Sequence, residues 1–307
     1  MLAGRIELAG LLVGLATGAK YPGVFLLVPL VVAGWRRWRT LAVGIAVAAA
    51  AFLATSPFVL VHPEQAWSDA ARVQRLARAG WLGFEHDSFA LLAFPGRLWD
   101  ALGPALVVGV LGLVLALRRR TRADLVLAAF VLAYFADLLT LRAHFDRYVL
   151  PLVPPLAALA GRQRLLAPLT LALAVVPLAW SIGDDVRLTR TDTRVVAARW
   201  LEANVPASAS VAAESSTPLV PHEQELPLAL PGPGRPFDPK RDVSRLRRLR
   251  VQYVVVTGAI ADRVLAARDR YPREARFYDE LRTQAKRVYH VSPGNGLTGP
   301  WLSVYRL

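Results

Sequence analysis

Two short polar segments and one lysine carry the side chains that could do chemistry in this chain of 307 residues. The denser segment is Arg142-Ala-His-Phe-Asp-Arg-Tyr148. Its cationic side chains, Arg142, His144 and Arg147, together with Tyr148, could form a rim that holds a phosphate group, and Lys20 could join them. Alternatively, the segment is a solvated turn and Lys20 is a lysine whose ammonium group reaches water from a helix end.

The second segment places a carboxylate, an imidazole and another carboxylate in a row, at Glu85, His86 and Asp87. Because neighbouring side chains seldom point the same way, we do not expect these three to bind a metal. Asp87 or Ser88 is expected to cap the helix that follows, and His86 and Asp87 remain candidates for the mouth of a substrate site. No cofactor is indicated, although a divalent metal is compatible with the chemistry. The chain has no cysteine, which excludes disulfides and thiolate catalysis.

These residues are embedded in a chain that is too apolar for an ordinary soluble protein. Hydrophobic residues make up 54% of it, and its mean hydropathy is +0.36. The apolar residues form long blocks up to Trp180, whereas charges and prolines are spread throughout the remainder. We therefore expect a transmembrane domain at 1–180, with an outer loop at 59–99, and a soluble domain at 181–307.

The net charge of +14 has two possible explanations. In a soluble protein it would suggest nucleic acid. Here, however, much of the arginine lies beside apolar blocks, where anionic lipid headgroups fit better. Membrane lipid is therefore the expected partner, and nucleic acid is not.

A helix needs about 20 apolar residues to cross a bilayer. Blocks 41–58, 101–117 and 125–141 meet this requirement, and the shorter, proline-containing blocks 148–161 and 165–180 are also predicted to cross. Blocks 6–19 and 23–35 flank Lys20 and Pro22, which indicates either two short helices meeting at a break or one kinked span. The predicted fold is an α-helical polytopic membrane domain of about six or seven membrane helices.

Arginine clusters at 36–39, 118–122 and 162–164 recur after every second predicted crossing. The positive-inside rule assigns such connections to the cytoplasm. This topology places Lys20, the 59–99 loop, the 142–147 connector and everything after Trp180 outside the plasma membrane. Asp137, inside a predicted span, should pair with an arginine or line a cavity. Residues 64–79 form an amphipathic pattern that predicts either an interfacial helix or a packed connector.

The C-terminal part predicts a small extracytoplasmic α/β domain. Residues 193–204 are typical of an amphipathic helix, 218–239 form a Pro/Gly-rich irregular insertion, and 253–257 are typical of a buried strand. Further helices are expected at 261–270 and 273–286, and further strands at 210–213, 288–291 and 302–306. A single glycine after the buried strand is no phosphate-binding fingerprint, so no nucleotide site is predicted.

Together, these segments resemble the membrane glycosyltransferases of the C superfamily, particularly the family 39 and Rgt-like proteins related to protein mannosyltransferases and aminoarabinose transferases. The resemblance implies transfer of a sugar from a polyprenyl-phosphate donor to an acceptor on the outer face of the membrane. It rests on GLLVGLATGAKYPG (10–23), ATSPF (54–58), DRYVLPLVP (146–154), WLEANVP (200–206) and YVVVT (253–257).

The resemblance also implies a catalytic carboxylate on an outer loop several spans before the segment matching Lys20. The one earlier carboxylate, Glu7, falls on the cytoplasmic side of the predicted topology. The chain is therefore expected to be the C-terminal part of such an enzyme: a fragment, a mis-started frame or a protein without catalysis. A non-catalytic scaffold or binding protein is the alternative. A transporter is less favoured, because no internal repeat is apparent.

Overall fold

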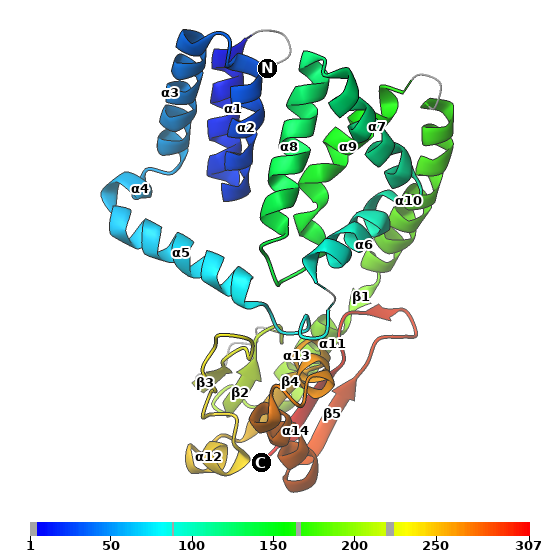
Figure 1. Ribbon diagram of the computed structural model, residues 1–307. Coiled ribbons are helices and arrows are strands. Elements are labelled where there is room, and N and C mark those ends of the chain that lie inside the picture. The colour runs from blue at the N-terminus through cyan, green and yellow to red at the C-terminus, as the bar shows by residue number, and fades with distance from the viewer. Residues whose placement is uncertain (1–4, 88, 164–166, 219–223) are drawn as a thin grey trace. The chain divides into compact units, whose positions relative to one another are not determined.

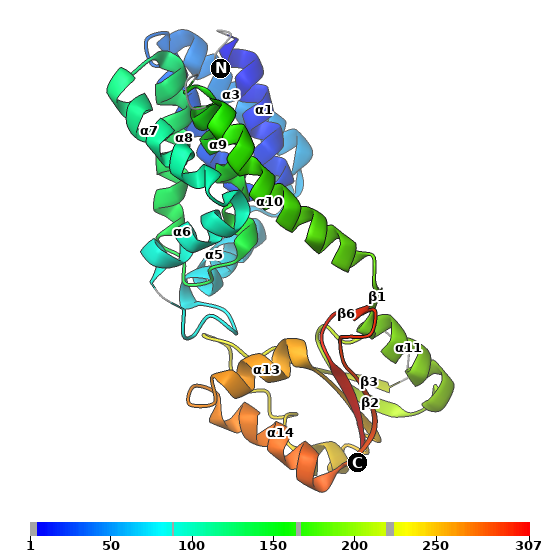
Figure 2. The ribbon, with the colours of Figure 1, turned by 90° about the vertical axis from the view of Figure 1, so that its right-hand side faces the viewer.

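The computed structural model describes residues 5–87, 89–163, 167–218 and 224–307 (Figures 1 and 2). Its contacts divide the chain into two compact units. Unit 1 comprises Met1–Arg78 and Asp87–Trp180, and unit 2 comprises Ala79–His86 and Ser181–Leu307. Each unit is described by itself below.

Unit 1 is helical throughout. Its elements are α1 (Ile6–Ala19), η1 (Tyr21–Leu26), α2 (Leu27–Gly34), α3 (Trp38–Thr55), α4 (Phe58–Val61), α5 (Pro63–Ala79), α6 (Ala90–Leu102), α7 (Ala105–Arg119), α8 (Arg122–Leu138), η2 (Asp146–Tyr148), η3 (Leu150–Leu152), α9 (Val153–Gly161) and α10 (Ala167–Leu188), which continues into unit 2.

Fewer helices than predicted are long and apolar enough to cross a membrane. Within the described ranges there are two, Trp38–Thr55 and Pro168–Leu188, or three if α6 and α7 form one span bent by 116°. The predicted span at 101–117 is interrupted because Gly103 adopts φ 53° and Pro104 follows it. Likewise, α1 ends at Ala19 and Lys20 is extended, which confirms two short helices meeting at a break.

Close packing of α1 against α3 depends on small residues, and the two helices lie side by side in Figure 1. A Cβ atom added to Gly10 would lie 2.0 Å from the carbonyl oxygen of Gly44, and one added to Gly14 would lie 2.2 Å from that of Ala48. Glycines spaced four residues apart occupy one face of a helix and let two backbones approach, as at many helix interfaces in membranes.

Helix α5 has the amphipathic pattern predicted for 64–79, and no residue in it is buried. Trp67 is 78% exposed and Val73 62% exposed. This exposure argues against a packed connector, and among the residues that the structure describes the apolar face of α5 has no partner along most of its length. Its last turn is anchored, because the backbone amide of Arg142 donates to the carbonyl oxygen of Ala77.

Unit 2 is built on a five-stranded sheet with the order β3-β2-β4-β7-β5. The strands are β2 (Ser210–Glu214), β3 (Gln224–Leu228), β4 (Tyr253–Thr257), β5 (Lys286–Val291) and β7 (Leu302–Arg306). Strands β3, β2 and β4 are parallel, and β7 is antiparallel to both neighbours. A small second sheet pairs β1 (Thr191–Asp192) with β6 (Leu297–Thr298).

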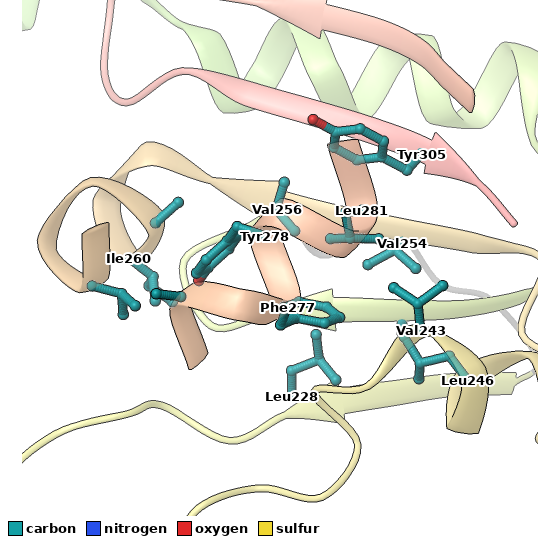
Figure 3. Close-up of a cluster of buried hydrophobic side chains, with 14 of the residues drawn as sticks. Leu228, Val243, Leu246, Val254, Val256, Ile260, Phe277, Tyr278, Leu281 and Tyr305 are labelled. Atoms are coloured by element: carbon teal, nitrogen blue, oxygen red, sulfur yellow. The ribbon is translucent and has the colours of Figure 1, made fainter. Parts of the chain in front are cut away.

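Helices cover both faces of this sheet, and successive residues of β4 supply both cores. Val254 and Val256 pack against α12 (Val243–Arg248), α13 (Gly258–Ala266) and α14 (Pro272–Gln284), as Figure 3 shows. Val255 faces the other side, towards α11 (Thr193–Asn204). Figure 2 shows α13 and α14 on one side of the sheet and α11 on the other. Side chains of β4 alternate between the two faces with the two-residue period of a strand, which confirms 253–257 as a buried, central strand.

Two expectations for this part of the chain need correction. The Pro/Gly-rich segment 218–239 is not wholly irregular, because it contributes the edge strand β3, where Pro227 is tolerated. The loop after α5 does not belong with the membrane-type helices. Residues 79–86 belong to unit 2, where Leu82 is 1% exposed within the hydrophobic core.

Candidate functional site

Arginines of the second and third clusters, Arg119 and Arg162, meet at Asp124, whose side chain is fully buried. Arg162 Nε lies 2.8 Å from Asp124 Oδ1, and Arg119 Nη2 lies 3.5 Å from the same atom. Thr121, the N-cap of α8, donates its hydroxyl to Asp124 Oδ2 at 2.6 Å. A buried carboxylate needs such partners, since leaving it unpaired would cost several kcal/mol.

Arg122 links the residues around Asp124 to α2, the helix that precedes the first cluster. Its Nη2 donates to the carbonyl oxygen of Ala33, near the end of α2, at 2.8 Å. In Figure 1 the α2–α3 and α7–α8 turns lie at the same end of unit 1. One common end is what the predicted topology requires of connections on a single side of a membrane.

The other end of unit 1 brings together Asp87 and His144, two of the predicted site residues. His144 is 4% exposed, with Nδ1 3.1 Å from Asp87 Oδ2 and Nε2 3.2 Å from the carbonyl oxygen of Leu141. The ring of Phe94 packs edge-on against the imidazole, with 5.1 Å between centroids. Asp87 therefore does not cap α6, whose N-cap is Phe89 without a side-chain bond. Ser88 lies outside the described residues.

Arg97 of α6 joins the same cluster. Its Nε lies 3.1 Å from Asp146 Oδ1, and its Nη2 lies 3.9 Å from Asp87 Oδ2. Asp146 begins η2 in the 142–148 connector. The guanidinium thus bridges the start of α6 and the connector, and its side chain remains 32% exposed.

A hollow of about 350 Å³ opens beside this cluster on α6. It is lined by Asp87, Leu92, Ala93, Gly96, Arg97, Trp99 and Asp100. Arg97 and Asp100 are three residues apart and therefore lie on one face of the helix. Asp100 is exposed and makes no side-chain hydrogen bond or ion pair with any residue that the structure describes. The hollow therefore combines a guanidinium group with a carboxylate that can accept a proton.

The remaining residues of the predicted rim lie at the same end without converging on this hollow. Arg147 stacks on its neighbours, 4.1 Å from the Phe145 centroid and 5.5 Å from that of Tyr148. The carbonyl oxygen of Tyr148 accepts the Tyr134 hydroxyl at 3.0 Å. Tyr134 also packs against Phe25 of η1, which fixes the segment after Lys20 next to the connector.

Lys20 and Arg142 carry unpaired positive charges at this end. Both side chains are exposed, and within the described ranges neither has a hydrogen-bond or ion-pair partner. Asp137 is half-buried and forms no ion pair within 4 Å in the same ranges, although Arg78 of α5 acts on it electrostatically.

His86 belongs to unit 2, whereas its neighbour Asp87 belongs to unit 1. In unit 2 its Nε2 is 3.9 Å from Asp269 Oδ1, while Glu85 accepts the Tyr271 hydroxyl at 2.6 Å. Glu85, His86 and Asp87 therefore have separate partners. Among the residues with described positions, no three His, Asp or Glu side chains converge as a metal site would require.

Arg97 and Asp100 were not recognised from the sequence, although a signal was present. They are the two charged residues of an otherwise apolar helix, and they lie three residues apart. Block 101–117 was read as a span that begins at Ala101, which placed both residues in its outer flank rather than on a separate helix.

Comparison with known proteins relates a large part of the helical unit to one protein family. Residues 1–141 match the model of glycosyltransferase family 87. The match covers 141 of 307 residues, slightly less than half of the chain. No curated protein and no solved structure matches significantly. The match and the apolar helices support a membrane glycosyltransferase. The matched region includes the hollow on α6 and ends just before the 142–148 connector.

Proposed function

We propose that this protein is a glycosyltransferase of the plasma membrane that takes a sugar from a polyprenyl-phosphate donor at the hollow on α6. The observation that supports this proposal most is that the hollow presents Arg97 and Asp100 side by side, at the end of unit 1 opposite the arginine clusters. We also propose that the protein is related to the family 39 and Rgt-like glycosyltransferases.

The proposed step needs a base at the acceptor hydroxyl and a cation at the departing phosphate. Asp100 takes the proton of the acceptor hydroxyl while the oxygen of that hydroxyl forms a bond to the anomeric carbon of the donor sugar. The bond from that carbon to the phosphate oxygen breaks, and the phosphate leaves with the electron pair. Arg97 stabilises the negative charge that develops on it.

The neighbouring groups hold this arrangement in place. Asp87 and Asp146 orient the Arg97 guanidinium, and His144 orients Asp87. Lys20 and Arg142, exposed and unpaired among the described side chains, add positive charge to this end of unit 1, and Arg147 is held over aromatic rings at the same end, but none of the three lines the hollow. His86 is not needed in this scheme.

The topology proposed with this function places the hollow and unit 2 on the extracytoplasmic side of the membrane. Support comes from Leu82, since its burial in unit 2 requires the loop after α5 and the C-terminal domain to share one side. Helices too short to span alone, such as the α6–α7 pair, would then make broken crossings, which neighbouring helices can stabilise.

A non-catalytic binding protein is the second candidate, favoured by one observation. Arg97 already faces two carboxylates, Asp87 and Asp146, so its charge is partly neutralised before any phosphate binds. In that case the hollow would hold a lipid-linked sugar without transferring it.

Binding of undecaprenyl phosphate tests the donor site under either candidate. Full-length protein in nanodiscs of neutral lipid would be titrated with this lipid and followed by native mass spectrometry. Arg97→Gln should weaken binding about tenfold or more, since a charge-assisted hydrogen bond contributes roughly 1.5 to 3 kcal/mol. Arg118→Gln, an exposed arginine at the other end of unit 1, is the matched control and should bind like the wild type. Equal losses in both variants would refute the site.

A further inference from the structure

Unit 2 contains a second hollow, of about 560 Å³, far richer in positive charge than the hollow on α6. It is lined by Pro206, Arg247, Arg250, Val251, Gln252, Tyr253, Arg306 and Leu307. All these residues belong to unit 2, and no Asp or Glu side chain is among them. The hollow lies where β4 begins and β7 ends, beside the end of α12.

The three guanidinium groups are largely unneutralised. Arg250 and Arg306 make no side-chain hydrogen bond or ion pair within the described part of the chain, and Arg247 donates once, to the carbonyl oxygen of Gln284 at 2.6 Å. Most of their hydrogen-bond donors are therefore free for a ligand.

Two features of the backbone concentrate this charge at a cost in stability. Arg250 adopts φ 59°, in the left-handed region that glycine occupies without steric strain. The register of β5 and β7 sets Lys286 directly opposite Arg306, and like charges in such pairs repel. The backbone amide of Val251 donates to the carbonyl oxygen of Leu246, so the left-handed residue ends α12 at a position where glycine is usual, and an arginine there adds its charge to the hollow.

We propose that this hollow binds a phosphate ester, with Arg247, Arg250 and Arg306 holding the phosphate oxygens and the Tyr253 ring supporting the group that carries it. Guanidinium groups match phosphate because their donors form a planar fork that can bond two oxygens at once. An aromatic ring beside them favours a sugar phosphate over free phosphate, since the ring packs against the apolar face of a sugar. The site is independent of the transfer reaction proposed for unit 1.

Binding is tested with full-length protein in nanodiscs of neutral lipid, titrated with glucose 1-phosphate, glucose and inorganic phosphate by isothermal calorimetry. The wild type should bind glucose 1-phosphate most tightly and glucose undetectably. Arg250→Gln combined with Arg306→Gln should weaken binding on the order of a hundredfold, about tenfold for each lost guanidinium. The control Arg199→Gln removes an exposed, unpaired arginine from α11 and should leave the affinity unchanged.

A second variant separates binding from folding. Arg250→Gly removes the guanidinium while relieving the left-handed backbone, so thermal stability should be kept or raised while affinity falls about tenfold. A parallel measurement with phosphatidylglycerol vesicles identifies the source of the phosphate. Arginine-dependent binding to vesicles alone would assign a lipid headgroup, and binding to glucose 1-phosphate alone would assign a soluble ester. Binding to neither, or equal binding by the double variant and the wild type, would overturn the proposal.

Discussion

The imidazole Nδ1 of His144 lies 3.1 Å from the carboxylate Oδ2 of Asp87, although 57 residues separate them in the chain. The second ring nitrogen faces the carbonyl oxygen of Leu141. The imidazole therefore lies between a carboxylate and a backbone carbonyl oxygen. This pair closes the end of unit 1 around the start of α6, and it orients the carboxylate that faces Arg97.

Removing the Asp87 carboxylate should therefore destabilise the protein. Asp87→Ala removes the carboxylate that faces Nδ1 of buried His144 and should cost about 1 to 3 kcal/mol, measured by thermal or denaturant unfolding in detergent. The control Asp69→Ala removes an exposed carboxylate paired with Arg72 and should change stability by about 0.5 kcal/mol or less. Equal effects of the two substitutions would show that the His144–Asp87 pair contributes nothing special.

The α1–α3 interface predicts a sharp contrast between two glycines. A Cβ at Gly14 would lie 2.2 Å from the Ala48 carbonyl oxygen, so Gly14→Ala must separate the helices and should cost roughly 1 to 3 kcal/mol. Gly183 of α10 has no atom within 4 Å of such a Cβ, and Gly183→Ala should be neutral or stabilising by up to about 1 kcal/mol. A reversed order in thermal stability would contradict the packing.

A buried ion pair anchors the carboxyl ends of β2 and β4 in unit 2. Arg241 Nη1 lies 2.8 Å from Glu214 Oε1 and 3.0 Å from the Tyr278 hydroxyl, and Glu214 Oε2 accepts the Thr257 amide. Burial alone would lower the pKa of Arg241, but Glu214 and Tyr278 raise it overall. Arg241 therefore stays charged.

Breaking this pair should cost more than replacing it. Arg241→Met strands the Glu214 carboxylate in the core and should destabilise unit 2 by about 3 to 5 kcal/mol. Adding Glu214→Leu removes the stranded charge, and the double variant should recover part of that loss. Pulse proteolysis of the full chain would measure both. A double variant no more stable than Arg241→Met would contradict this prediction.

Asp192 gives unit 2 an acid-sensitive contact. It caps α11 and accepts from the Arg194 side chain at 2.7 and 2.9 Å, and these bonds lower its pKa below the ordinary 3.8, although partial burial opposes them. The stabilisation is therefore complete above pH 3.8 and is lost as pH falls through the lower pKa of the folded state. Asp192→Asn should keep the cap but flatten this part of the pH–stability profile. An unchanged profile would exclude the linkage.

Periodicity predicted the sheet of unit 2 well because its strands obey local rules. The run of valines from 254 to 256 fits a strand covered on both faces, and α11 and α14 follow their amphipathic patterns. Strand β3 was missed because Pro227 and the surrounding glycines indicate irregular chain, whereas pairing with β2 at the sheet edge overrides that preference.

The helical unit was harder to predict, because apolar composition says where a membrane helix can lie but not where it breaks. Gly103 and Pro104 divide a block that reads as one span, and the partner of Asp87 lies in a connector that no local pattern links to it. The spacing of Gly10, Gly14 and Gly18 could have predicted the α1 interface, since small residues at every fourth position mark close helix packing.

Sugar transfer at the hollow on α6 is tested most directly by the rate of transfer by the Asp100→Asn variant. Full-length protein in liposomes would be supplied with a panel of polyprenyl-phosphate-linked hexoses and pentoses and with extracted cell-envelope glycans as acceptors. We expect wild type and the control Asp69→Asn to transfer sugar equally, while Asp100→Asn is slower by about 10²- to 10⁴-fold with undecaprenyl phosphate binding unchanged. A wild-type rate in Asp100→Asn, or no transfer by the wild type from any donor, would contradict sugar transfer at this hollow.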